Sequence, residues 1–186
     1  MLVYLHGFNS SPRSHKAQVL KSYMEERGLG ARYACPTLPD TPEQAMRAIE
    51  QAIKGRDLRT VTFIGSSLGG YYATWFVEKR GGRAVLINPA ITPHAGLAAY
   101  LGPQKNLHTG APYELKRAHL EGWRALLLER IDPEKYLLLL ETGDEVLDWR
   151  EAAQKYEGAR MVIRQGGDHS LRCFPEMIPR ILAFAA

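Results

Sequence analysis

The stretch Thr60-Val61-Thr62-Phe63-Ile64-Gly65-Ser66-Ser67-Leu68-Gly69-Gly70 joins a short apolar run to the pattern G-x-S-x-G, with Ser67 at its centre. The apolar run predicts a strand over residues 60–64, and the residues after the pattern predict a helix over about residues 68–80. A serine on so sharp a strand-to-helix turn needs small neighbours, which the two flanking glycines supply. In this context the pattern predicts a nucleophilic serine at Ser67.

Five further short runs resemble the strand that precedes this turn. Several are apolar without alternation, which is typical of strands buried on both faces of a sheet. The predicted strands cover residues 2–5, 32–35, 60–64, 84–87, 137–141 and 160–164. The predicted helices include one that Gly28 ends, one that begins at Pro42 after the N-cap Thr41, one from near Asp148, and one from about Pro175 to the C-terminus. This order predicts right-handed βαβ units and one mostly parallel sheet of about six strands with helices on both faces.

Residues 1–186 are predicted to form a single domain, and residues 90–133 interrupt its regular alternation. This segment contains no predicted strand, and a helical stretch is expected near residues 113–131. Its length favours a small helical cap over a site, and the alternative is an ordinary crossover with extra helices.

The composition excludes several classes of protein. The net charge is +4, but basic residues are scattered along the chain, which disfavours a nucleic-acid surface. Two distant cysteines are too few for a disulfide framework, and no signal-peptide pattern is present, so we expect a cytoplasmic protein. No apolar run approaches the roughly 20 residues that span a bilayer. The oligomeric state is left open.

Two further residues with catalytic potential follow predicted strands. Asp144 comes shortly after residues 137–141, and His169 after residues 160–164. Because parallel strands end at one edge of the sheet, Ser67, Asp144 and His169 are expected at the same rim. The chain order serine, acid, histidine is that of the α/β-hydrolase fold, so we predict a three-layer fold of this class with a Ser-His-Asp triad.

Each predicted triad member has rivals in the sequence. Ser66 lacks flanking glycines at the required spacing, and Glu145 lies one step further from its strand and is expected to point to solvent. Asp148 is expected to serve as the N-cap of the following helix. The remaining histidines neither follow the last strand nor show a metal-ligand spacing: His6, His15, His94, His108 and His119. No metal and no cofactor are expected.

An oxyanion hole needs two preorganised donors. The amide of Leu68, directly after the nucleophile, is the first expected donor, and the amide of Phe8, in the loop after the first strand, is the second. The candidate substrate-binding walls are Tyr71, Tyr72 and Trp123, and core packing is the alternative for such aromatic residues.

Several motifs together resemble the YqiA-type esterases of bacteria, over essentially the whole chain. They are residues 5–12 (LHGFNSSP), 65–75 (GSSLGGYYATW), 88–90 (NPA), 142–148 (TGDEVLD) and 166–169 (GGDH). The resemblance implies a compact α/β-hydrolase that lacks the usual first two strands, and hydrolysis of carboxylic esters or acyl thioesters without a cofactor. The family's nucleophile, acid and base fall on Ser67, Asp144 and His169. Asp168 departs from the pattern, because an amide-like residue is expected before the histidine.

The predicted function is therefore a serine esterase, or a thioesterase, that acts on a small-molecule acyl substrate. One alternative is a non-catalytic protein that keeps the fold and binds a small molecule in the pocket. A nucleic-acid-associated protein is a third class, suggested by the basic isoelectric point of about 9.1 alone.

Overall fold

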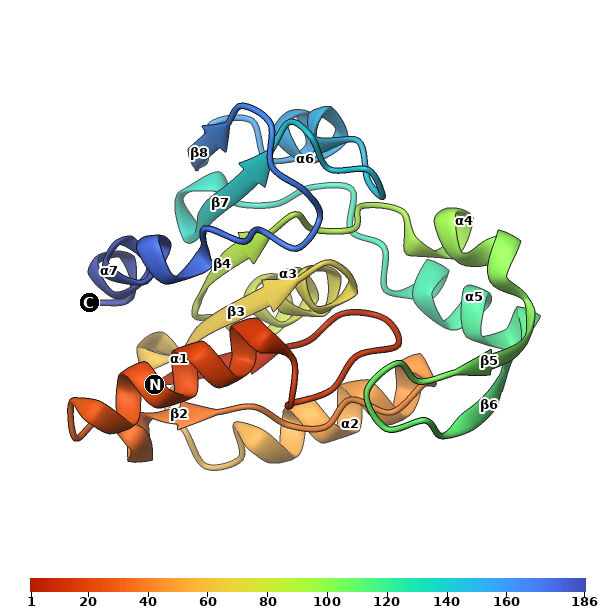
Figure 1. Ribbon diagram of the computed structural model, residues 1–186, viewed down its shortest axis with the longest axis horizontal. Coiled ribbons are helices and arrows are strands. Elements are labelled where there is room, and N and C mark those ends of the chain that lie inside the picture. Colours follow the sequence, from red (N-terminus) through yellow and green to blue (C-terminus); the bar gives the residue numbers. More distant parts are fainter.

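The computed structural model describes all residues from 1 to 186, and its centre is a six-stranded parallel sheet (Figure 1). The strand order is β2-β1-β3-β4-β7-β8. The bounds are β1 Leu2–Leu5, β2 Tyr33–Ala34, β3 Thr62–Ser66, β4 Arg83–Ile87, β7 Tyr136–Glu141 and β8 Arg160–Arg164. All six strands predicted from the sequence are present, and β2 is shorter than predicted.

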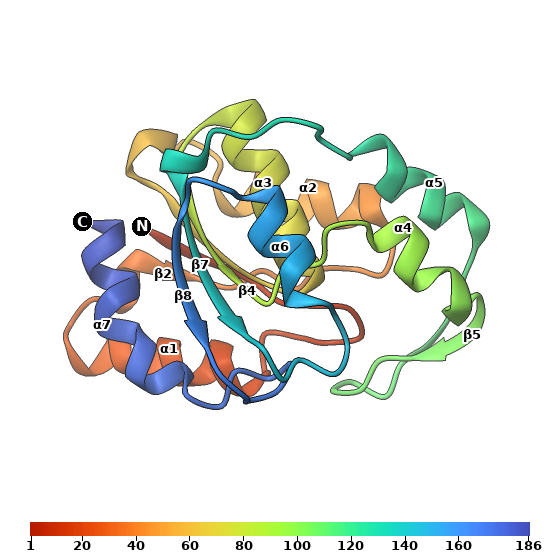
Figure 2. The same cartoon turned by 90° about the horizontal axis from the view of Figure 1, so that it is seen from above.

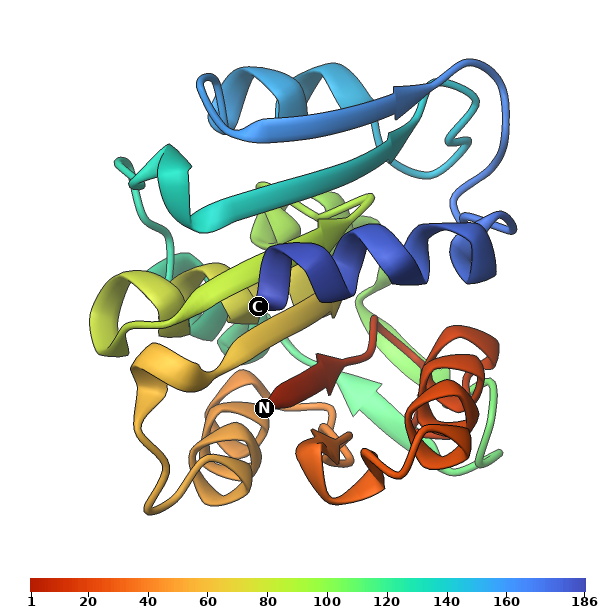
Figure 3. The ribbon, with the colours of Figure 1, turned by 90° about the vertical axis from the view of Figure 1, so that its left-hand side faces the viewer.

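Helices cover both faces of this sheet, and Figure 2 shows the two layers on opposite sides of the strands. The helices packed on the sheet are α1 His15–Glu26, α2 Pro42–Ala52, α3 Leu68–Arg80, α6 Trp149–Lys155 and α7 Phe174–Ala185. The helices α2, α3 and α6 pack on one face, while α1 and α7 pack on the other, with α7 running along the middle strands in Figure 3.

Alternate residues of each central strand point into the two opposite cores. In β1, Val3 belongs to the core beneath α2 and α3, whereas Tyr4 belongs to the core beneath α1 and α7. In β7, Leu138 and Leu139 are divided between the two cores in the same way. Burial on both faces explains why these strands are apolar at every position.

The helix boundaries follow from local capping. Thr41 Oγ1 accepts a hydrogen bond from the amide of Gln44 at the start of α2, as predicted. The reciprocal bond of a full capping box, from Gln44 back to Thr41, is absent. Asp148 caps α6 by accepting from the amide of Arg150, and Gly28 ends α1 with a left-handed φ of 69°.

The segment of residues 90–133 contains two strands, which corrects the expectation that it holds none. After the short helix α4 (Pro93–Gly96), β5 (Gly102–Lys105) and β6 (Pro112–Leu115) form an antiparallel hairpin. The helix α5 then spans only Arg117–Ala125, less than the predicted stretch. Both strands are short and largely polar, so they lack the apolar signal that identifies a buried strand. None of the helices is both long and apolar enough to cross a bilayer.

The strand register places the loops after β1, β3, β4, β7 and β8 at one edge of the sheet. Leu5 pairs with Gly65, Ser66 with Ile87, and Glu141 with Arg164, so neighbouring strands end together. The segment of residues 90–133 lies beyond this carboxyl edge (Figure 1). Its hairpin contacts the loop after β1, because the amide of Leu107 donates to the carbonyl oxygen of Asn9 at 3.0 Å.

Candidate active site

Ser67 occupies the turn between β3 and α3 in a conformation that few residues adopt. Its φ is 53° and its ψ is −121°, outside the ordinary strand and helix regions. A Cβ added to Gly65 would lie 2.5 Å from the Cα of Gly70, and one added to Gly69 would collide with the carbonyl oxygen of Leu5. The two glycines around the serine therefore allow β3, α3 and β1 to pack closely, as the sequence pattern predicts.

His169 and Asp144 are directly hydrogen-bonded, with 2.7 Å between Nδ1 and Oδ2. The side chain of Asp144 is 1% exposed and that of His169 is 21% exposed. Burial alone raises the pKa of Asp144, but hydrogen bonds from His169 and from the amides of Leu147 and Val146 outweigh it, so the pKa lies below its ordinary value. Asp144 is thus a buried carboxylate held in its charged form.

Ser67 and His169 line one cavity of about 600 Å³ at the carboxyl edge of the sheet. No hydrogen bond joins Ser67 Oγ to the imidazole ring. The hydrogen bond to Asp144 favours the tautomer with a proton on Nδ1, which leaves Nε2 as an acceptor. The carboxyl edge therefore brings the predicted nucleophile, base and acid to one site, with the serine and histidine on the cavity wall.

The two residues predicted to supply the oxyanion donors lie near Ser67: Leu68 follows it in the chain, and Phe8 lines the same cavity. Leu68 is the first residue of α3, so its amide has no acceptor one turn earlier in the helix. The amide of Phe8 donates to no main-chain oxygen. At Gly7 the loop after β1 comes close to the turn that carries Ser67, because a Cβ on Gly7 would lie 3.7 Å from Ser67 Oγ. The phenyl ring of Phe8 packs edge-on against Tyr113 of the hairpin.

His6 fixes this loop from within the core. Its Nε2 accepts from the amide of Leu38 at 3.0 Å, while Nδ1 lies 3.1 Å from the carbonyl oxygen of Gly7. Burial lowers the pKa of His6 to about 4, so the ring is neutral at pH 7. A neutral ring can donate from one nitrogen and accept at the other, which both contacts require.

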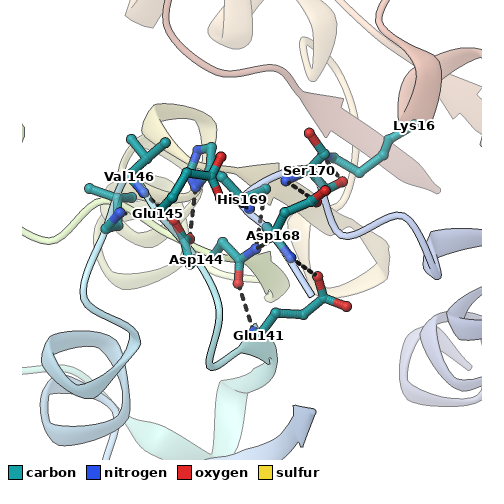
Figure 4. A network of polar contacts seen from close by, with 10 residues as sticks. Lys16, Glu141, Asp144, Glu145, Val146, Asp168, His169 and Ser170 are labelled. Carbon is teal, nitrogen blue, oxygen red and sulfur yellow. Dashed lines mark hydrogen bonds and ion pairs between the residues drawn. The ribbon is translucent and has the colours of Figure 1, made fainter. Parts of the chain in front are cut away.

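The main chain of residues 168–170 is held by four side chains from three parts of the chain, and three of these side chains are labelled in Figure 4. Glu141 accepts from the amide of Asp168 at 2.8 Å, and Glu145 accepts from the amide of His169 at 3.0 Å. Lys16 donates to the carbonyl oxygen of Ser170 at 2.6 Å. The segment that carries His169 is thereby anchored at three consecutive residues.

Asn88, directly after β4, completes this anchoring. Its Nδ2 donates to the carbonyl oxygens of Asp168 and His169, both at 3.2 Å, and its Oδ1 accepts from the amide of Glu141. Asn88 is 3% exposed and has a φ of 39°. Sequence reasoning did not assign a role to Asn88, Glu141 or Lys16; the position of Asn88 at a strand end was the available signal.

The rival acids have other partners. Asp148 caps α6, as predicted from the sequence. Glu145 is exposed, as expected, but its carboxylate also accepts a hydrogen bond from the amide of His169, which the sequence did not predict. Across residues 1–186, no group of three or more histidine, cysteine, aspartate or glutamate side chains is placed to hold a metal ion.

The three aromatic residues predicted as substrate walls lie in the core beside the site. Trp123 Nε1 donates to the hydroxyl of Tyr72, and the hydroxyl of Tyr71 donates to the carbonyl oxygen of Trp123, both at 2.7 Å. None of the three lines the cavity that contains Ser67. Tyr72 and Trp123 border a separate space of about 20 Å³ next to Leu68, which is room for a single water. A role in substrate binding stays a prediction.

Solved structures with the same architecture come from several organisms. A protein of Agrobacterium vitis S4 superposes with a TM-score of 0.73 at 19% identity, covering 100% of this chain and 87% of that one. Mouse alpha/beta hydrolase domain-containing protein 10 gives 0.71 at 14% identity, covering 98% and 87%. Est1E from Butyrivibrio proteoclasticus gives 0.67 at 14% identity, covering 98% and 88%. These likenesses confirm the predicted α/β-hydrolase fold.

Sequence comparison identifies the family. A "UPF0227 protein" of Shewanella woodyi (strain ATCC 51908 / MS32) is 29% identical over 94 residues, which are 50% of this chain and 52% of that relative. The match thus spans about half the length of the curated relative. The model of the family described as "Uncharacterised protein family (UPF0227)" matches residues 1–186, the whole chain. The resemblance carried by the sequence motifs is thereby confirmed as a family relationship, and the chain belongs to the UPF0227 family.

Proposed function

We propose that this protein is a serine hydrolase that cleaves carboxylic esters, with acyl thioesters as the related substrate class. The observation that carries the proposal is the 2.7 Å hydrogen bond between His169 and Asp144 at the same cavity as Ser67. Ser67 stands on a strained turn at the start of a helix, where a nucleophile is exposed and an oxyanion is stabilised. Several structural neighbours are named hydrolases or esterases, which supports the same class of reaction.

The proposed reaction has two acyl-transfer steps. In the first, His169 Nε2 takes the proton of Ser67 Oγ as the oxygen attacks the acyl carbon, after the substrate brings these two groups into hydrogen-bond contact. Asp144 stabilises the imidazolium through its hydrogen bond to Nδ1. His169 then protonates the leaving alcohol or thiol, and Ser67 remains acylated. In the second step His169 activates water, which releases the acid and restores the serine.

The amides of Leu68 and Phe8 are the proposed donors to the oxyanion in both steps. Preorganised donors of this kind contribute about 10² to 10³ in rate for each hydrogen bond. Because both are main-chain groups, their position depends on the glycines of the turn and on the buried ring of His6.

The proposal is tested by hydrolysis of p-nitrophenyl esters, from acetyl to long-chain acyl, by the wild type and Ser67→Ala. Ser22→Ala, on the exposed side of α1, is the matched control. We expect activity in the wild type and control that disappears in Ser67→Ala, and a fluorophosphonate adduct on Ser67 only. Activity that persists in Ser67→Ala overturns the assignment of the nucleophile. A wild type that hydrolyses none of the esters and forms no adduct would favour the alternative, a non-catalytic protein that binds a small molecule.

A further inference from the structure

The cavity beside Ser67 has a wall that is unusual in its charges. Several of its lining side chains are basic, and none carries a carboxylate. The basic side chains are those of His15, Lys16, His108, His169 and Arg172. An ester with an uncharged acyl chain and an uncharged alcohol makes no use of such a wall. The lining of the cavity therefore indicates the charge of the substrate as well as the position of the scissile bond.

Lys16 is the cation on this wall that lacks a counter-ion. Its ammonium group donates one hydrogen bond, to the carbonyl oxygen of Ser170, and forms no ion pair within 4.0 Å. An ammonium group has three N–H bonds, so two remain for a ligand. Burial lowers the pKa of Lys16, and the charges of Asp168 and Glu141 act in the opposite direction. Burial without a counter-ion is costly for an ammonium group, and an anionic ligand offsets that cost.

Each carboxylate near Lys16 is bound to another partner, and none of them lines the cavity. Asp144 binds His169, and Glu141 binds the amide of Asp168 together with the thiol of Cys173. Asp168 itself pairs with Arg172, with 2.6 Å between Oδ2 and Nε. Arg172 is therefore compensated, and its side chain is 87% exposed. Lys16 alone presents an unpaired permanent charge to the cavity.

The start of α1 adds uncharged donors to the same place. Ser14 is the N-cap of α1, but its side chain makes no capping hydrogen bond, and its Oγ is buried without a partner. Ser14 lines the same cavity as Lys16. The first amides of a helix carry a partial positive charge that favours anions. Ser14 and Lys16 thus border the same cavity at the start of α1.

We propose that the substrate of this site carries a carboxylate, which binds Lys16 and the first turn of α1 while the ester carbonyl lies at Ser67. The inference rests on the proposed serine-hydrolase function, and it restricts the substrates to acidic esters or thioesters. The carboxylate belongs either to the acyl part or to the alcohol part of the ester, and both have the same binding chemistry.

The test compares charged and neutral esters of matched length. Mono-p-nitrophenyl glutarate against p-nitrophenyl valerate places the charge in the acyl part, and 3-carboxyphenyl acetate against phenyl acetate places it in the leaving group. The quantity measured is the ratio of kcat/KM for the charged ester to that for the neutral one. Because Lys16 also contacts Ser170, its replacement can slow both reactions, but such a loss cancels in the ratio.

We expect a ratio above one in the wild type for at least one pair, and the pair that responds identifies the part of the ester that is charged. Lys16→Met should lower that ratio about tenfold or more, whereas Lys16→Arg should retain most of it. The control is Lys21→Met, which removes the same charge from an exposed site on α1 where Lys21 pairs with Glu25. A wild-type ratio below one for both pairs, or an equal fall in Lys16→Met and Lys21→Met, overturns the proposal.

A binding measurement tests the anionic site at Lys16 separately from the hydrolase function. Glutarate should raise the Tm of the wild type and of Lys21→Met, and should leave that of Lys16→Met unchanged. If no ester is hydrolysed, the proposed function fails, and the glutarate result alone decides whether the anionic site exists. If esters are hydrolysed but glutarate has no effect and the ratios are unchanged, the hydrolase remains and the anionic site is rejected.

Discussion

Asn88 supports His169 through the main chain, with its Nδ2 3.2 Å from the carbonyl oxygen of the histidine. The same amide group reaches the carbonyl oxygen of Asp168, and its oxygen accepts from the amide of Glu141. One side chain at the end of β4 therefore connects β7 to the loop that carries the proposed base. This contact links the packing of the sheet to the position of the imidazole.

Replacing Asn88 should affect both stability and catalysis. Asn88→Ala leaves the buried amide of Glu141 without an acceptor, which costs about 1–3 kcal/mol in the free energy of unfolding, and it leaves two partly buried carbonyl groups without a donor. Asn88→Asp keeps the left-handed backbone and the acceptor, but it places a carboxylate against two carbonyl oxygens. At a temperature where both variants are folded, we expect kcat to fall about tenfold or more with KM nearly unchanged. A kcat equal to that of the wild type would show that the loop is positioned without Asn88.

The buried ring of His6 should make stability depend on pH. Its pKa is about 4 in the folded protein and about 6.5 when unfolded, so the unfolded chain binds the proton first. This contribution is complete above pH 6.5 and is lost as the pH falls to about 4; it amounts to about 3 kcal/mol. Urea unfolding between pH 7 and 4 should show that difference between the wild type and His6→Gln. The exposed His108→Gln is the control and should follow the wild type, and parallel curves for all three would contradict the prediction.

The glycines of the turn between β3 and α3 should tolerate replacement by alanine far less than other glycines do. Gly69→Ala places a Cβ against the carbonyl oxygens of Leu5 and His6, and backbone atoms cannot move away cheaply. We expect a loss of about 3 kcal/mol or more in unfolding free energy, or a chain that does not fold. Gly96→Ala meets nothing within 4 Å and has a helical φ of −63°, so it should be neutral or gain up to about 1 kcal/mol. A Gly69→Ala variant as stable as the wild type would exclude the close packing of α3 on β1.

The sheet could be predicted from the sequence because its central strands are apolar on both faces. Ser67, Asp144 and His169 could be predicted because each follows such a strand, and parallel strands end together. The hairpin of β5 and β6 could not, since its short strands are polar and contact the β1 loop through hydrogen bonds between residues far apart in the chain. Lys16 was also missed, because α1 meets the loop after β8 only in three dimensions, 154 residues apart in the chain.

The two aspartates after β7 allow a direct test of which one serves the proposed base. Asp144 is buried and binds Nδ1 of His169, while Asp148 is exposed and caps α6. In Asp144→Asn the amide no longer stabilises the imidazolium or fixes the tautomer, so kcat should fall by up to about 10⁴. In Asp148→Asn the side chain still accepts at the N-cap position, so stability and kcat should change little. Steady-state hydrolysis of one p-nitrophenyl ester by both variants decides between the two aspartates. An equal fall in kcat, or a larger fall in Asp148→Asn, would show that Asp144 is not the acid of the triad.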